Sequence, residues 1–409
     1  MIKSSTLSCQ FANPGKQESL DHFIDEYQRV VSSFIDLLWY LEKVPQLLPF
    51  EITSQIKDSW LSARAIQAAG KQASGIVRGT RKKQEQRAWK IQDLHDKGYH
   101  RQARKLEAIH QKRQVSKPLI TTIQPELDSR FVSMDFENST TFDGWINISS
   151  LGEKIKIQIP VKFHKHFNRL NREGILKKGI RISKKMITLM FEIEKPEKKL
   201  EGSILGIDIG YLNVLSCSNG FQSQKNKDEH DLQTISRRLS RKIKGSKAFA
   251  RAQTHRKNFI HQTINQLNLD GIQEVRLENI KNLRKGRRSS RLLSHWIYPE
   301  IVEALESRCL DQGVLVKKVS PTYTSQRCSG CGWTRKSNRK GKQFRCGSCG
   351  LTLDSDLNAS KNIVFDLRPI GKSERLQNKN RKGFYWTSVG QEQHIVPDVQ
   401  KVHSLNEIL

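Results

Sequence analysis

The sequence predicts an α+β protein of several domains, and three changes in hydrophobic patterning along the chain support this prediction. Apolar residues recur at helical spacing from residue 17 to about residue 114, and then alternate with period two in much of 119–200. From residue 203 onward, short apolar runs typical of strands alternate with helical stretches, as in an α/β domain. With 409 residues the chain is long enough for about two to four domains.

The N-terminal half is expected to combine a helical domain with a small β domain. A stripe at helical spacing marks the start of the helical part, and its members are Leu20, Phe23, Ile24, Tyr27, Val30 and Val31. Residues 1–12 can form one strand, which we expect to close an antiparallel barrel with the alternating segments that follow the helices. We therefore assign residues 1–15 and 118–200 to a β-barrel domain and residues 16–117 to the helical domain.

The second half begins with two strand candidates, residues 203–209 and 213–218, followed by helical spacing from about residue 228 to 269. The apolar stripe of this helical region consists of Leu232, Ile235, Leu239 and Ile243. Residues 237–257 contain nine Lys or Arg and no acid. A helix with one buried face and one basic face can lie along a phosphate backbone.

The chain is strongly basic, with 71 Lys and Arg against 41 Asp and Glu, which gives a formal charge of +30. Such an excess repels itself in the folded state unless a polyanion offsets it. Nucleic acid is the expected partner, because each neutralised phosphate releases a counterion. The charge clusters in 237–257, 281–291 and 335–345, which a long structured RNA can contact at once. Residues 81–114 fit either a solvated helical hairpin or a surface that faces nucleic acid.

The sequence favours a cytoplasmic, nucleoid-associated protein. No apolar stretch approaches the roughly 18 residues needed to span a bilayer, and the N-terminus lacks the apolar core of a signal peptide. Of the seven cysteines, three stand alone, namely Cys9, Cys217 and Cys309. An odd total with isolated members does not resemble a secreted disulfide framework, so we expect a reducing compartment.

The other four cysteines, Cys328, Cys331, Cys346 and Cys349, form two Cys-x-x-Cys pairs separated by fourteen residues. Two such knuckles supply four thiolates for one tetrahedral zinc ion, and a site closed by four protein ligands is structural. We therefore assign residues 321–352 to a zinc ribbon. The basic segment between the knuckles, "TRKSNRKGKQFR", is expected to reach a nucleic acid.

Three acids lie where strands end or a helix begins. Asp208 and Glu278 each follow a short apolar run, "SILGI" and "EVRL", and Asp356 opens a helix-like segment just after the cysteine quartet. An unpaired carboxylate at the edge of a buried sheet is costly, and bound cations would remove that cost. Carboxylates presented together can hold two Mg²⁺ ions for phosphodiester hydrolysis. The alternative is that these acids lie in solvent-exposed turns.

The segments "GIDIG", "LENI", "SPTYTSQRCSGCG" and "CGLTLDSDLNASKNI" resemble the RuvC-type nuclease half of TnpB proteins. These are RNA-guided DNA endonucleases encoded by insertion sequences and related to compact type V CRISPR effectors. The resemblance covers about residues 203–365 and implies an RNase H-like fold with acids in the order Asp, Glu, Asp. Asp208, Glu278 and Asp356 match that order. Asp354 competes for the third place, and Asp356 is preferred because Asn358 and Ala359 follow it in the family pattern.

The resemblance also implies a domain organisation. Residues 201–320 and 353–367 would form the RuvC-type nuclease domain, interrupted by the zinc ribbon. The β-barrel would be a wedge domain and the helical domain a recognition domain, which together hold a guide RNA and read a short DNA motif. The polar segment 368–409 is expected to be a disordered tail.

The function implied is RNA-guided cleavage of target double-stranded DNA at a single site, with two catalytic Mg²⁺ ions, one structural Zn²⁺ and a bound guide RNA, by a monomer or homodimer. Asp208 would bridge both Mg²⁺ ions, while Glu278 and Asp356 would each complete one. A compact type V CRISPR effector and a guided repressor that does not cut are the alternatives. A DNA transposase of the same superfamily would normally end its triad in Glu, and a purely structural zinc protein would not need the acids or the basic helices.

Overall fold

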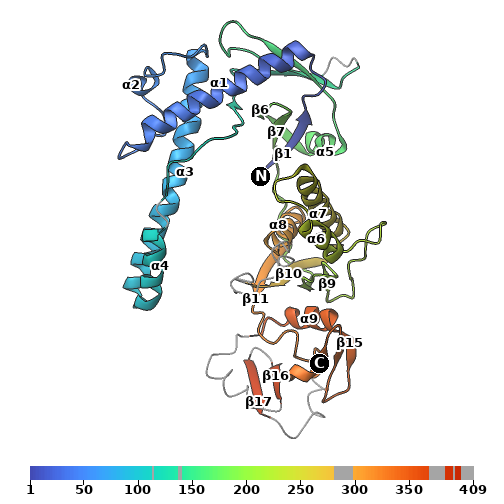
Figure 1. Cartoon of the computed structure of the whole chain (residues 1–409). Coiled ribbons are helices and arrows are strands. Elements are labelled where there is room, and N and C mark those ends of the chain that lie inside the picture. The colour runs from blue at the N-terminus through green and yellow to red at the C-terminus, as the bar shows by residue number, and fades with distance from the viewer. Residues whose placement is uncertain (113–114, 137–140, 281–297, 368–382, 390–391, 398–409) are drawn as a thin grey trace. The chain divides into compact units, whose positions relative to one another are not determined.

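The computed structural model describes residues 1–112, 115–136, 141–280, 298–367, 383–389 and 392–397 (Figure 1). The chain divides into two compact units, Met1–Glu194 and Lys195–Leu409. Both units combine helices with sheets, so the prediction of a mixed α/β protein of several domains is confirmed. None of the described helices combines the length and the apolarity needed to cross a bilayer.

The first unit contains a helical part formed by α1 (Pro14–Trp39), α2 (Phe50–Thr53), α3 (Ala63–Asp96) and α4 (His100–Lys112). Asn13 caps α1 by accepting a hydrogen bond from the Lys16 amide at 2.9 Å. Every member of the predicted apolar stripe of α1 is buried, and α1 packs along α3. Toward its C-terminal end α3 loses its buried face, and α4 buries only Ala103 among its side chains.

The sheets of the first unit are antiparallel. One has the order β1 (Ile2–Ser8), β7 (Met186–Ile193), β6 (Gly174–Ile182) and β2 (Glu126–Leu127). The other contains β3 (Val132–Asp135), β4 (Gly144–Ile148) and β5 (Ile157–Val161). Helix α5 (Lys165–Glu173) follows β5 and precedes β6 in the sequence. The N-terminal strand β1 therefore joins the strands that follow the helices, as expected. Closure into a barrel stays a prediction.

The second unit contains a four-stranded sheet with the order β11 (Leu315–Val319), β10 (Ile272–Glu278), β8 (Ser203–Asp208) and β9 (Ser216–Cys217). Strands β8, β10 and β11 run parallel, and β9 pairs antiparallel with β8. The helices of this unit are α6 (Leu232–Ser240), α7 (Lys247–Asn265), α8 (Tyr298–Leu310) and α9 (Ser355–Val364). Apolar residues of α6, α7 and α8 share one core with the sheet.

The predicted stripe on the basic helix is correct for Leu232, Ile235 and Leu239, which are buried on α6. It is wrong for Ile243, which is 80 % exposed, because α6 ends at Ser240 and a separate helix starts at Lys247. The predicted basic loop 281–291 lies outside the described residues.

Short strands form the segment around the cysteine quartet. They are β12 (Trp333–Thr334), β13 (Arg339–Lys340), β14 (Gln343–Arg345) and β15 (Thr352–Asp354), with one 3-10 turn, η2 (Lys336–Asn338). Strands β13, β14 and β15 pair antiparallel in sequence order. Because β15 ends at Asp354 and α9 begins at Ser355, this small sheet leads directly into the helix that contains Asp356.

The prediction of a disordered tail over 368–409 is wrong for part of that segment. Strands β16 (Phe384–Val389) and β17 (Glu392–Pro397) form a hairpin, and β16 pairs with β12. The physical reason is aromatic burial, since Phe384 and Trp386 are almost completely buried and the ring centroids of Tyr385 and Trp333 lie 4.8 Å apart. Most of the polar run "SERLQNKNRKG" lies outside the described residues.

Candidate functional site

Two of the predicted acids end adjacent parallel strands. Asp208 is the last residue of β8 and Glu278 the last of β10, and the strands are in register up to the pair Leu277 and Ile207. The next residues along both strands are the two acids, and parallel strands present their carboxyl ends at the same edge of a sheet. Buried Leu277 and Ile207 hold these strand ends in the core, so the two carboxylates are placed side by side by the sheet itself.

Helix α9 brings the third acid to the same place. It packs on β8 at Gly206, where a Cβ atom would collide with the backbone carbonyl oxygen of Ser360. A glycine is therefore required for this close approach of helix and strand. The Asp356 Oδ2 atom lies 3.6 Å from the position that a Cβ on Gly210 would take, just beyond the end of β8. The structure thus brings Asp208, Glu278 and Asp356 together from three elements.

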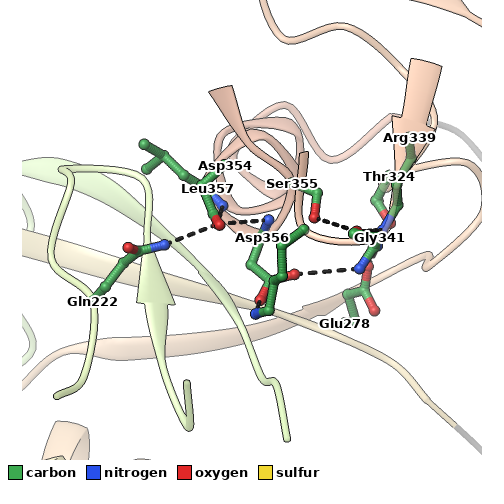
Figure 2. Close-up of polar contacts among 10 residues, drawn as sticks. Gln222, Glu278, Thr324, Arg339, Gly341, Asp354, Ser355, Asp356 and Leu357 are labelled. Atoms are coloured by element: carbon green, nitrogen blue, oxygen red, sulfur yellow. Dashed lines mark hydrogen bonds and ion pairs between the residues drawn. The ribbon is translucent and has the colours of Figure 1, made fainter. Parts of the chain in front are cut away.

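Asp354 and Asp356 have different surroundings (Figure 2). The Asp354 side chain caps α9 by accepting hydrogen bonds from the backbone amides of Asp356 and Leu357, at 3.0 and 3.1 Å, and it also accepts one from Gln222 at 2.9 Å. The Asp356 carboxylate is 6 % exposed and lies with the other two acids. Asp356 therefore lies with Asp208 and Glu278, whereas Asp354 caps the start of α9.

The three acids repel one another in a site with little water. Burial, then the charges of Glu278 and Asp356, raise the pKa of Asp208 to about 8. Burial also raises the pKa of Glu278, and a hydrogen bond donated by the Thr324 hydroxyl to Glu278 Oε1 opposes that rise. The ionised form of a partly buried carboxylate with a raised pKa is strongly stabilised when a cation binds next to it. The donor set, all carboxylate oxygen, fits Mg²⁺.

Two basic side chains contact Asp356 in this structure. Lys342 forms an ion pair with Oδ2, and Arg339 forms one with Oδ1 at 3.3 Å. Both belong to the β13–β14 hairpin between the cysteine pairs, so two side chains of the basic segment expected to reach nucleic acid face Asp356. The sequence analysis missed Lys342, Arg339 and Thr324. The short connection from Cys349 to Asp356 was the available signal, because it holds the hairpin near the third acid.

The four cysteine sulfurs also gather in one place. Their Sγ atoms all lie within 4.8 Å of one another, with Cys328 and Cys349 3.7 Å apart and Cys331 and Cys346 3.6 Å apart. A tetrahedral zinc ion with Zn–S bonds of about 2.3 Å places its sulfurs roughly 3.8 Å apart. Thiol hydrogen bonds from Cys328 and Cys331 lower the pKa of Cys346. The quartet therefore fits a structural zinc ion.

Buried amide side chains connect the quartet to α9. Asn358 accepts a hydrogen bond from the Ser329 amide at 3.0 Å and donates one to the Arg327 carbonyl at 2.8 Å. Asn362 donates to the carbonyls of Thr324 and Arg327 and accepts from the Arg327 guanidinium at 2.6 Å. All of these side chains on α9 are buried. The first cysteine knuckle and the helix bearing Asp356 are consequently one hydrogen-bonded assembly.

Comparison with known proteins finds one matching family model and several similar proteins. Residues 298–363 match the model of the family described as "Cas12f1-like, TNB domain". The chain is 35 % identical over 96 residues to the CRISPR-associated endodeoxyribonuclease Cas12f1 of Sulfoacidibacillus thermotolerans, covering 23 % of this chain and 22 % of that protein. It is 27 % identical over 194 residues to the "Putative RNA-guided DNA endonuclease InsQ" of Escherichia coli K12, covering 40 % and 48 %.

A third relative is the TnpB-like protein aq_aa05 of Aquifex aeolicus, which is 34 % identical over 98 residues, covering 22 % of this chain and 32 % of that protein. The matched segments span less than half of the length of each of these relatives. The family match covers α8, β11, the quartet and nearly all of α9 with Asp356, whereas Asp208 and Glu278 lie before the matched residues. Residues 298–363 thus match the Cas12f1-like TNB domain, and parts of the chain are similar to TnpB-like and Cas12f1 proteins.

Proposed function

We propose that this chain is an RNA-guided endonuclease that hydrolyses target DNA at a single site formed by Asp208, Glu278 and Asp356. The observation that carries the proposal is the meeting of these three carboxylates at the ends of β8 and β10 and at the start of α9. The names of the relatives, which include an endodeoxyribonuclease and an RNA-guided DNA endonuclease, support the same reaction.

Each residue of the site has a proposed role that follows from its position. The three carboxylates would hold two Mg²⁺ ions, which would supply Lewis-acid chemistry for phosphodiester hydrolysis. Asp208 interacts electrostatically with both other acids, and Asp208, Glu278 and Asp356 would together hold the ions. Thr324 would hold Glu278 in its orientation through the hydroxyl hydrogen bond. The RuvC-type, RNase H-like fold belongs to this proposal.

Guidance by RNA is the second part of the proposal. The formal charge of +30 exceeds what a short duplex contact requires, and the basic segments are distributed along the whole chain. A bound guide RNA would neutralise much of this charge and select the target by base pairing, with the protein reading a short adjacent DNA motif, by physical analogy with Cas9-type recognition. The β and helical parts of the first unit would then serve as wedge and recognition domains.

The test uses the full chain purified with its co-expressed RNA and a plasmid that contains the matching target. Asp208→Ala, Glu278→Ala and Asp356→Ala should each abolish cleavage while target binding remains, because affinity comes from pairing and phosphate contacts. Asp354→Ala is the matched control. It removes the α9 cap, so it should lower stability by about 1 kcal/mol and retain cleavage.

Two outcomes would contradict the proposal. If Asp354→Ala were inactive and Asp356→Ala fully active, the third acid would be wrongly assigned. If protein stripped of RNA cut a defined site, the chain would be a metal-dependent nuclease without a guide. The RNA recovered from the active particle should be sequenced in the same experiment, since the proposal expects its variable end to match the cleaved target.

A further inference from the structure

We propose that Lys342 and Arg339, two side chains of the zinc-ribbon hairpin, compete with divalent metal for Asp356, so that metal loading depends on whether these side chains point toward Asp356 or toward solvent. The inference rests on the metal-binding role of Asp356 in the proposed function. The inference adds that two side chains of the protein itself reversibly block metal binding at Asp356.

The first step is that the pair is held at the acid by the fold. Lys342 lies in the two-residue turn between β13 and β14, after Gly341, whose φ of 63° suits a tight hairpin turn. Buried Ser355 anchors that turn to the start of α9. Its amide donates to the Lys342 carbonyl at 2.8 Å and its hydroxyl donates to the Gly341 carbonyl at 3.0 Å. The backbone of the turn is therefore fixed one residue away from Asp356.

The second step is that both oxygens of Asp356 are already engaged. Oδ1 pairs with Arg339 and Oδ2 with Lys342, and the carboxylate is 6 % exposed. The two side chains supply two positive charges, equal to the charge of one Mg²⁺ ion. A divalent ion cannot take either oxygen without displacing an ion pair, so its apparent affinity is reduced by the fraction of protein in the blocked arrangement.

The third step is that the pair is able to leave. The side chains of Lys342 and Arg339 are 43 % and 36 % exposed, whereas Asp356 is buried. Rotation of either basic side chain toward solvent needs no movement of the anchored turn. Nucleic-acid phosphates bound along the ribbon would give both side chains another anionic partner. Nucleic-acid binding and metal binding at Asp356 would then favour each other by the same factor.

The experiment measures Mn²⁺ binding to the zinc-loaded, RNA-free full chain by the loss of the free Mn²⁺ spectroscopic signal. Lys342→Gln should bind Mn²⁺ at least about tenfold more tightly than the wild type, because a positive charge in contact with the site is removed. Arg339→Gln should act in the same direction with a smaller effect, since its contact is longer. Lys340→Gln is the matched control. Lys340 is exposed on β13, and its substitution changes the net charge by the same amount as Lys342→Gln.

A second readout is the Mg²⁺ concentration for half-maximal cleavage by the RNA-loaded particle, which should fall for Lys342→Gln and not for Lys340→Gln. Zinc content and melting temperature confirm that each variant is folded. If Asp208→Asn weakens Mn²⁺ binding but Lys342→Gln does not tighten it, competition is refuted and the metal site stands. If Asp208→Asn leaves Mn²⁺ binding unchanged, the measured Mn²⁺ does not bind at the triad. Both this inference and the proposed metal-dependent reaction then fail.

Discussion

The two candidate metal sites of the second unit differ in how completely the protein assembles them. In the cysteine quartet all four ligand atoms come from one short segment and lie within 4.8 Å of one another. The acids come from two strands and a helix separated by up to 148 positions in sequence, and one of them is paired with Arg339 and Lys342. A structural site can use protein ligands at every coordination position of its ion. A catalytic site must leave coordination positions free for water and substrate.

Loss of the quartet should have the largest effect. Cys346→Ser removes one of four thiolates, and structural zinc sites supply a large part of the folding free energy of small ribbons. We expect loss of zinc, several kcal/mol of lost stability and loss of cleavage, because Asn358 and Asn362 join the first knuckle to the helix of Asp356. Elemental analysis and calorimetry measure the first two effects.

Cys309→Ala is the control for that experiment. Cys309 is a buried thiol in α8 outside the quartet, so its loss should cost only about 1 kcal/mol and leave the zinc content unchanged. If Cys346→Ser kept its zinc, or if it lost zinc and still cut DNA at the wild-type rate, the two sites would be independent of each other.

The acid site should have an inverted pH dependence. The pKa of Asp208 is raised to about 8 in the folded, metal-free protein, and its ordinary value is 3.8. Between these values the folded state binds more protons than the unfolded state, so stability falls as pH rises through this window. Asp208→Asn removes the effect, and the metal-free variant should therefore be more stable than the wild type at pH 8 by a few kcal/mol, and equal to it near pH 4.

Chemical denaturation at pH 5, 7 and 8.5 in the presence of a magnesium chelator tests this expectation. Added Mg²⁺ should reverse the order at pH 8, because the wild-type carboxylate gains a partner that asparagine cannot replace. A constant difference between the two proteins at every pH would show that Asp208 is not in a coupled, poorly hydrated site.

The smallest predicted effect concerns the packing that brings the acids together. Gly206→Ala places a methyl group against the Ser360 carbonyl and should cost about 1–3 kcal/mol while moving α9, with Asp356, away from β8. Gly79→Ala is the matched control, because Gly79 lies in α3 with no neighbour near its Cβ position and should gain up to about 1 kcal/mol. Thermal melts and the Mg²⁺ dependence of cleavage should separate these two alanines.

Sequence reasoning predicted the elements well where one local pattern decided the structure. The apolar stripe of α1 and the strands ending at Asp208 and Glu278 followed from periodicity alone. The pairing of β16 with β12 was missed because it joins residues about fifty positions apart through aromatic burial in a polar segment. The ion pairs of Arg339 and Lys342 were missed for a related reason, since a basic run predicts a charged surface and not which acid lies opposite it.

The returning C-terminal hairpin affects how this protein can be shortened or tagged. Phe384 and Tyr385 pair with β12, and the backbone amide of Trp386 donates to the Gly332 carbonyl at 3.0 Å, beside the first cysteine knuckle. A chain trimmed after Leu367 would keep every acid and every cysteine, yet it would leave an unpaired strand edge and the indole of Trp333 facing water, a common cause of aggregation. A miniaturised version of this protein should therefore keep residues 383–397 and shorten the chain elsewhere.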